Sequence, residues 1–150
     1  MLWTGNFRLV SSDVFFVFPK TPPIWPSTGF MTYLWIALGG AIGSVSRFAL
    51  SGLAARWLGQ AFLGTMAINV TGSFLIGFVA ALGPIKMWEQ ILMVGVLGGF
   101  TTFSSFSLQT LNLAQEGRWG AAGFNVVGSV VLCLAGVWLG HATGGCLVRR

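Results

Sequence analysis

Charged residues are scarce in this chain. Of its 150 residues only 7% are Asp, Glu, Lys or Arg, whereas 55% are hydrophobic, and the mean hydropathy is +0.81. A soluble domain usually carries about 25% charged residues. Because so few charges cannot cover a surface that faces water, the composition predicts a membrane protein surrounded mainly by lipid.

Histidine and cysteine are rarer still. The two cysteines, Cys133 and Cys146, are 13 positions apart, which on one helix separates them by about 20 Å, too far for a disulfide within the chain. His141, the single histidine, suits an ordinary place at the membrane interface, and no Cys/His cluster indicates zinc. The net charge is +5, but the basic residues are scattered singly, so nucleic acid is not an expected partner.

Proline is nearly confined to residues 1–30, which hold four of the five prolines. The apolar run within this stretch, Val14–Phe18, is too short for the core of a signal peptide. We therefore expect residues 1–30 to be an N-terminal extension or a misassigned start, mostly disordered. Residues 31–150 form the expected functional domain.

Four long apolar spans fill that domain, each long enough to cross a bilayer as a helix. They are Tyr33–Ala55, Ala61–Gly83, Ile91–Leu113 and Trp119–Gly140. The predicted fold class is an all-α membrane protein with four transmembrane helices. Small residues recur four apart, as in Gly39 and Gly43 or Gly136 and Gly140, and such pairs favour close helix approach.

The third span contains the most unusual stretch of the chain. It reads Gly98-Gly99-Phe100-Thr101-Thr102-Phe103-Ser104-Ser105-Phe106-Ser107. Adjacent glycines weaken a helix where unpaired backbone is costly, so we expect this span to break at Gly98-Gly99. Broken helices at membrane depth persist only where the freed backbone groups are buried in protein, bind an ion or line a wet cavity. The alternative is a small-residue packing face whose hydroxyls bond back to the preceding turn.

Only one charged residue, Arg47, interrupts a span, and no acidic residue lies within any span. An arginine at that depth either faces protein or water or extends toward the interface. The absence of an intramembrane carboxylate argues against proton-coupled or cation-coupled transport. The serines near residue 105 have no His or Lys within reach by sequence, so we do not expect an enzyme.

Polar side chains line one face of two other spans. Thr65, Asn69 and Ser73 are four apart in the second span, and Asn125 and Ser129 repeat that spacing in the fourth. An Asn in lipid must find hydrogen-bonding partners, and its NH₂ group donates to an anion without carrying charge. The other interpretation is that these residues only join helices.

Phe103 and Phe106 also allow two interpretations. Aromatic residues three apart on a helix usually pack against neighbours. A phenyl ring, however, has a positive edge, and rings turned edge-on offer a weak anion site. Together with Arg47, Asn69 and the hydroxyls, and without any acid, these rings suggest a small anion that accepts hydrogen bonds.

From about Met31 to Arg150 the chain resembles the Fluc/CrcB fluoride channels. The resemblance rests on four spans in the expected order and on three motifs. These are Gly39-Gly40-Ala41-Ile42-Gly43 followed by Arg47, then Gly64-Thr65 leading to Asn69, and the Gly98–Ser107 stretch. It implies a dual-topology homodimer of two antiparallel subunits, with two fluoride pores and a central Na⁺ held by backbone carbonyls.

The resemblance also implies roles for particular residues of this chain. Gly98 and Thr101 would supply the carbonyls for Na⁺, and Arg47 the cation of the pore entrance. The expected pore contacts are Asn69, the ring edges of Phe103 and Phe106, and the hydroxyls of Thr65, Thr102, Ser105 and Ser129. Asn125 stands where the family often has Tyr.

We therefore expect a passive channel that exports fluoride across a bacterial inner membrane. If translation starts at Met31, the positive charges that flank the spans are nearly balanced between the two sides of the membrane. Such a balance is required for a chain that inserts in both orientations. One rival is a small dual-topology multidrug exporter, which needs a membrane-embedded glutamate that is missing here. The other is a non-transporting membrane assembly subunit whose polar residues only pack helices.

Overall fold

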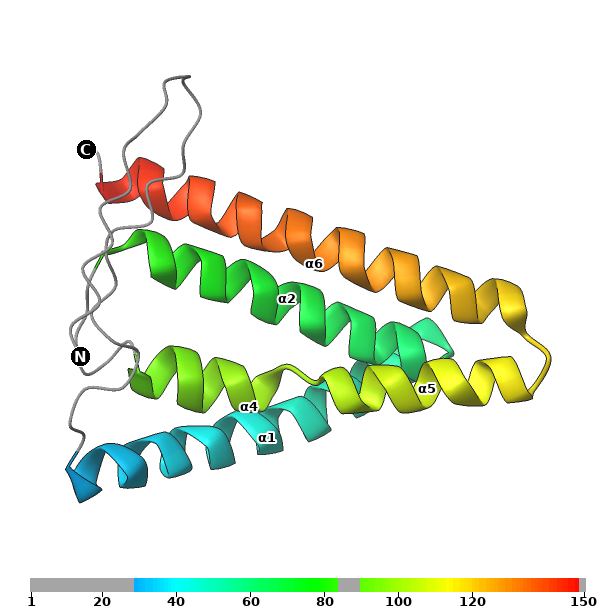
Figure 1. Ribbon diagram of the computed structural model, residues 1–150, viewed down its shortest axis with the longest axis horizontal. Helices are drawn as coiled ribbons and strands as arrows, with labels where there is room; N and C mark the ends of the chain where they lie inside the picture. Colours follow the sequence, from blue (N-terminus) through cyan, green and yellow to red (C-terminus); the bar gives the residue numbers. More distant parts are fainter. Residues whose placement is uncertain (1–28, 84–89, 149–150) are drawn as a thin grey trace, which may run out of the picture.

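The computed structural model describes residues 29–83 and 90–148, and every element within these ranges is helical. The elements are α1 (Phe30–Leu58), α2 (Ala61–Ala81), the π-helix η1 (Gln90–Leu97), α4 (Gly98–Phe100), α5 (Phe103–Gln115) and α6 (Trp119–Val148) (Figure 1). The extension expected at residues 1–30 lies outside the described residues except for its last two positions, and α1 begins at Phe30.

The helices form four segments long and apolar enough to cross a membrane, as expected. They are Phe30–Leu58, Ala61–Ala81, Ile91–Gln115 and Trp119–Val148. Three of them extend beyond the expected spans, since α1 continues to Leu58, the third segment to Gln115 and α6 to Val148. Backbone hydrogen bonding does not stop where the apolar run stops, so a helix continues until a residue ends it. For α1 that residue is Gly59, whose φ of 73° is left-handed.

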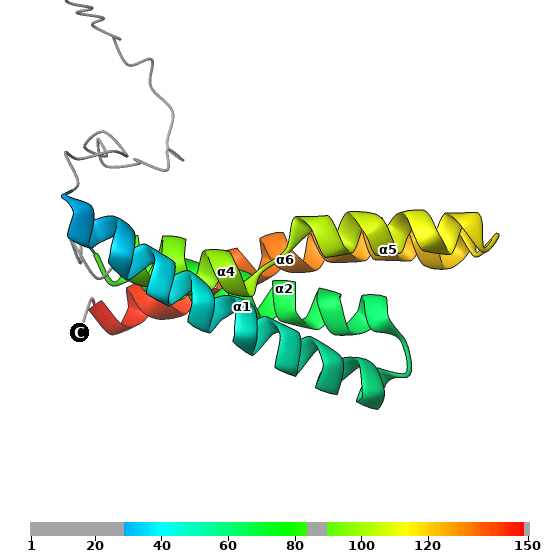
Figure 2. The ribbon, with the colours of Figure 1, turned by 90° about the horizontal axis from the view of Figure 1, so that it is seen from below.

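The segments run up and down through one bundle (Figure 1). The most extensive packing is between α2 and α6, and α1 packs on η1, α2 and α4. The view in Figure 2 shows the α1–α2 hairpin diverging from the α5–α6 pair at the end where their connecting turns lie. Many large apolar side chains on the outer faces are exposed, as expected of a surface that meets lipid.

Glycines set the closest helix approaches. A Cβ at Gly43 would overlap the carbonyl of Val96 in η1, and one at Gly140 of α6 would overlap the carbonyl of Phe74 in α2. Packing through small residues four apart, predicted from the sequence, is confirmed at these two crossings. These contacts fix the position of α1 against η1 and that of α6 against α2, the helix that carries Asn69.

The helix break expected at Gly98-Gly99 is wrong in its position. Both glycines lie in α4, and the extended residues are Thr101 and Thr102, with ψ of 156° and 117°. A Cβ on Gly99 would lie 2.7 Å from the carbonyl oxygen of Gly40. Gly99 therefore allows α1 to approach, and the chain leaves the helical conformation only after Phe100.

Candidate functional site

Asn69 of α2 pairs with the extended backbone between α4 and α5. Its Nδ2 donates to the carbonyl oxygen of Thr102 at 3.0 Å, and its Oδ1 accepts from the amide N–H of Thr102 at 2.8 Å. The carboxamide thus replaces the helical hydrogen bonds that the extended residue gives up, which is what backbone in lipid requires. Of the two N–H groups of the amide, this pairing uses one.

Thr102 also begins α5. Its Oγ1 accepts from the amide N–H of Ser105 at 3.2 Å, which is an N-cap interaction. The same hydroxyl donates to Ser105 Oγ at 3.1 Å and lies 3.2 Å from Ser104 Oγ. Two of the four hydroxyl residues expected to serve a pore, Thr102 and Ser105, therefore form a small hydrogen-bonded cluster with Ser104 at the start of α5, next to Asn69.

A pocket of about 300 Å³ opens at this point. Its wall comes from α2, from the η1–α5 segment and from one residue of α6, and comprises Asn69, Gly72, Ser73, Ile76, Leu97, Thr101, Thr102, Phe103 and Cys133. The structure thus brings together residues from three helices that sequence reasoning had placed on separate polar faces. None of the described residues that line this pocket is acidic.

The two phenylalanines of α5 differ in exposure. Phe103 is 77% exposed and borders the pocket, whereas Phe106 is 9% exposed. Their ring centroids lie 5.1 Å apart, with the ring planes tilted by 46°. In this tilted arrangement, positive ring edges are not hidden by face-to-face stacking.

Asn125 of α6 is buried against α5. Its Nδ2 donates to Thr110 Oγ1 at 2.8 Å, and its Oδ1 accepts from Ser129 Oγ at 3.3 Å. Thr110 in turn donates to the carbonyl oxygen of Phe106 at 2.8 Å. The polar face predicted at Asn125 and Ser129 is thus part of a connected chain of hydrogen bonds that reaches Phe106.

The remaining predicted residues lie outside the pocket near Asn69. Thr65 is buried one turn before Asn69 on α2, and Gly98 lies in α4. Arg47 is half-buried near the middle of α1, and within the described residues no ion pair joins it to an acidic group. Arg47 is therefore not part of the cluster that Asn69 and Thr102 form.

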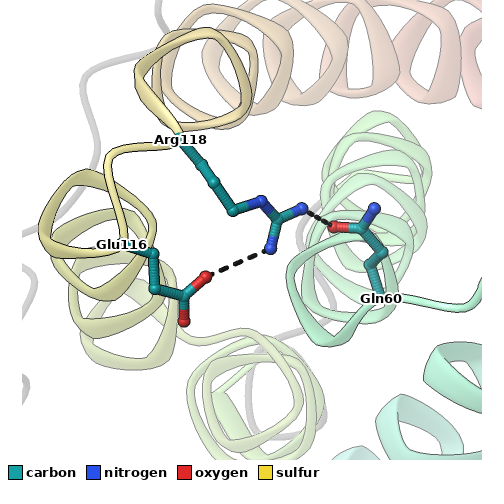
Figure 3. A network of polar contacts seen from close by, with 3 residues as sticks. All are labelled: Gln60, Glu116 and Arg118. Atoms are coloured by element: carbon teal, nitrogen blue, oxygen red, sulfur yellow. Dashed lines mark hydrogen bonds and ion pairs between the residues drawn. The ribbon is translucent and has the colours of Figure 1, made fainter.

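A larger pocket, of about 490 Å³, opens between the α1–α2 turn and the end of α5. Its polar wall includes Gln60, Gln109, Asn112, Glu116 and Arg118. Arg118 donates to Glu116 at 3.2 Å and to the side-chain oxygen of Gln60 (Figure 3). Because this contact joins the two turns, they lie at the same end of the bundle.

Sequence reasoning missed Thr110 and the larger pocket. Thr110 stands four residues after Phe106, and this spacing places both on one face of α5. The spacing could therefore have indicated that Thr110 lies next to the Phe106 turn. Gln60 and Arg118 are 58 positions apart, and nothing in either segment indicates that they meet. The Oε1 of Gln109 is buried without a hydrogen-bond partner in the described structure.

These features define a multi-pass helical membrane protein with a pocket beside the interruption of its third span, lined in the described structure by Asn69 and hydroxyl side chains among apolar ones. Residues 34–141 match the family described as CrcB-like protein, Camphor Resistance (CrcB), and the chain belongs to that family. The resemblance expected from the sequence motifs is thereby confirmed.

Curated relatives cover most of the chain. It is 62% identical over 117 residues to the fluoride-specific ion channel FluC of Opitutus terrae, covering 73% of this chain and 89% of that protein. It is 60% identical over 130 residues to FluC of Rhodospirillum rubrum, covering 80% and 98%. With FluC of Geobacter sulfurreducens it shares 47% over 115 residues, covering 73% and 93%. These relatives are named as channels, and the chain is not an enzyme.

Proposed function

We propose that this chain is a passive fluoride channel that exports fluoride from the cytoplasm across a bacterial inner membrane. The observation that carries the proposal is the high identity to proteins named fluoride-specific ion channels, over a region that includes Asn69 and Phe106. Fluoride enters cells as HF in acid surroundings and is trapped when it ionises inside. A passive path then lets the accumulated anion leave.

The chemistry of the pocket suits a small anion. Fluoride that leaves water loses strong hydrogen bonds, and the path must supply donors in their place. Asn69 has a second N–H beyond the one given to Thr102, and Thr65, Thr102, Ser105 and Ser129 carry hydroxyls. The edges of Phe103 and Phe106 provide weak positive sites between donors, and Arg47 attracts anions at the pore entrance.

We infer that two antiparallel copies form the working unit. One chain leaves Phe103 77% exposed beside an open pocket, and a partner across this face would enclose both. Antiparallel pairing places one pocket on each side of the two-fold axis, which gives two pores. Such pairing requires that the chain insert in both orientations.

A reporter fused to the C-terminus of a chain that starts at Met31 is expected on both sides of the membrane. The reason is the near balance between Lys86, Arg149 and Arg150 on one side and Arg56 and Arg118 on the other. Two or three Lys added on one side should fix the orientation and abolish fluoride efflux when that variant is expressed alone. A single orientation of the unmodified chain would contradict the dual-topology proposal.

We further propose a Na⁺ ion on the dimer axis, held by the carbonyls of Gly98 and Thr101 from each subunit. Thr101 is extended, with ψ of 156°, so its carbonyl leaves the direction of the helix axis. With no acidic side chain in the pocket, such a site relies on carbonyl dipoles. Anomalous diffraction from crystals grown with Tl⁺ in place of Na⁺ should give a peak on the axis, and water alone there would rule the site out.

Liposome flux tests the proposed function directly. Purified protein in fluoride-loaded vesicles should release fluoride in the absence of a proton gradient, because a passive channel needs no coupling ion. Release that depended on a proton gradient would indicate a coupled transporter. Absence of flux for any ion would indicate a membrane assembly subunit.

A further inference from the structure

Asn125 is the most enclosed large side chain in the described part of the molecule. It is 1% exposed, and it lies on α6 where that helix faces α5. Both ends of its carboxamide are engaged, the Nδ2 with Thr110 at 2.8 Å and the Oδ1 with Ser129 at 3.3 Å. A buried amide satisfied in this way specifies one arrangement of its neighbours.

The chain of bonds has a fixed direction. A Thr hydroxyl has one proton, and that of Thr110 goes to the carbonyl oxygen of Phe106 at 2.8 Å. Thr110 must therefore accept from Asn125, which requires the NH₂ group of the amide at this position. Bonds aligned donor to acceptor strengthen one another, so they connect α6 firmly to the turn of α5 that carries Phe106.

The same geometry changes the role expected of Ser129. Its hydroxyl proton is directed at the Oδ1 of Asn125, and Ser129 itself is only 6% exposed. Ser129 therefore supports Asn125 in the absence of an anion, and its rotatable hydroxyl can still turn toward an anion that passes.

We propose that Asn125 is a positioning residue, which acts through Thr110 to hold the Phe106 ring at the place where fluoride passes. This inference rests on the proposed function, because it assigns a task within the same channel. Phe106 contacts the exposed Phe103 at a centroid distance of 5.1 Å. A shift of the Phe106 turn would therefore move both ring edges.

The test uses variants of Thr110 in the full-length dimer reconstituted in liposomes. Thr110→Val keeps the shape but removes the hydroxyl, so fluoride efflux should fall about tenfold, within the usual range for coupled neighbours. Thr110→Ser restores the hydroxyl and should restore efflux. Thr143→Val is the matched control, because Thr143 on α6 also bonds the carbonyl four residues back, that of Leu139 at 2.9 Å, but has no bond to Asn125.

A double variant separates positioning from simple stability. Thr110→Val leaves the N–H of Asn125 buried and unpaired, and adding Asn125→Leu removes that group as well. Replacing both partners by apolar groups of similar shape restores stability, so the Tm of the double variant should recover while efflux stays low. Recovery of efflux together with Tm would overturn the inference, and so would normal efflux from Thr110→Val. Absence of efflux from the unmodified protein would overturn the proposed function and this inference with it.

Discussion

Fluoride efflux through the Phe106→Ile variant is expected to fall about tenfold, because the substitution removes the positive ring edge that we propose faces the anion. Ile keeps most of the bulk and all of the apolarity, and Phe106 is already buried at 9% exposure. The variant should therefore still purify as a dimer. Fluoride efflux from liposomes that contain equal amounts of dimer measures the effect.

Phe78→Ile provides the matched control. Phe78 belongs to the other aromatic pair of the described chain, with its ring centroid 6.5 Å from that of Phe74 on α2. Neither ring belongs to the wall of the pocket near Asn69, so the same substitution should change packing and leave efflux close to normal. Equal losses in the two variants would mean that Phe106 serves packing alone, and its assignment to the pore would have to be abandoned.

The sequence predicted the spans well because their signal is local. Apolar runs of about twenty residues indicate membrane helices whatever the rest of the chain does, and glycines four apart indicate close crossings. The ends of the spans were less well predicted. The end of α6 at Val148, well beyond the expected Gly140, depends on packing as well as hydropathy, since a Cβ on Gly144 would lie 2.6 Å from the carbonyl oxygen of Phe78.

The interruption of the third span shows where local reasoning fails. Two adjacent glycines suggested a break by their own flexibility, but both lie in α4, where Gly99 is in close contact with Gly40 of α1. The break occurs at Thr101 and Thr102 because Asn69, 33 positions away from Thr102, supplies the missing hydrogen bonds. Because Asn69 is so distant in sequence, nothing in the residues next to Thr102 indicates that Asn69 will stabilise it.

The structure also joins the two interpretations of Asn69 that the sequence left open. The amide connects α2 to the interrupted span, as a helix-joining residue does, and it borders the acid-free pocket. One N–H and the oxygen hold Thr102, and the other N–H remains for an anion. Stabilising the break and binding fluoride are therefore compatible tasks for this one side chain.

The Asn69→Asp variant is expected to show the largest loss, a fall in fluoride efflux of about a hundredfold or more, because a charge within a few ångströms repels the anion strongly at this depth. The carboxylate still accepts from the N–H of Thr102, but it has no N–H for the Thr102 carbonyl or for fluoride. Efflux from liposomes is again the measurement, with dimer yield as the check on folding.

Two comparisons separate the charge from the lost hydrogen bond. Asn69→Leu removes both bonds to Thr102 without adding charge, so it should reduce efflux less than Asn69→Asp if repulsion dominates.

Asn112→Asp adds the same charge at an exposed position of α5, where raised salt screens it within about 10 Å. Salt should therefore cancel any effect of Asn112→Asp but not that of Asn69→Asp, since the partner subunit of the proposed dimer encloses the pocket near Asn69 and keeps salt ions away from it. Near-normal efflux from Asn69→Asp dimers would show that Asn69 only joins helices, and the path would have to lie elsewhere.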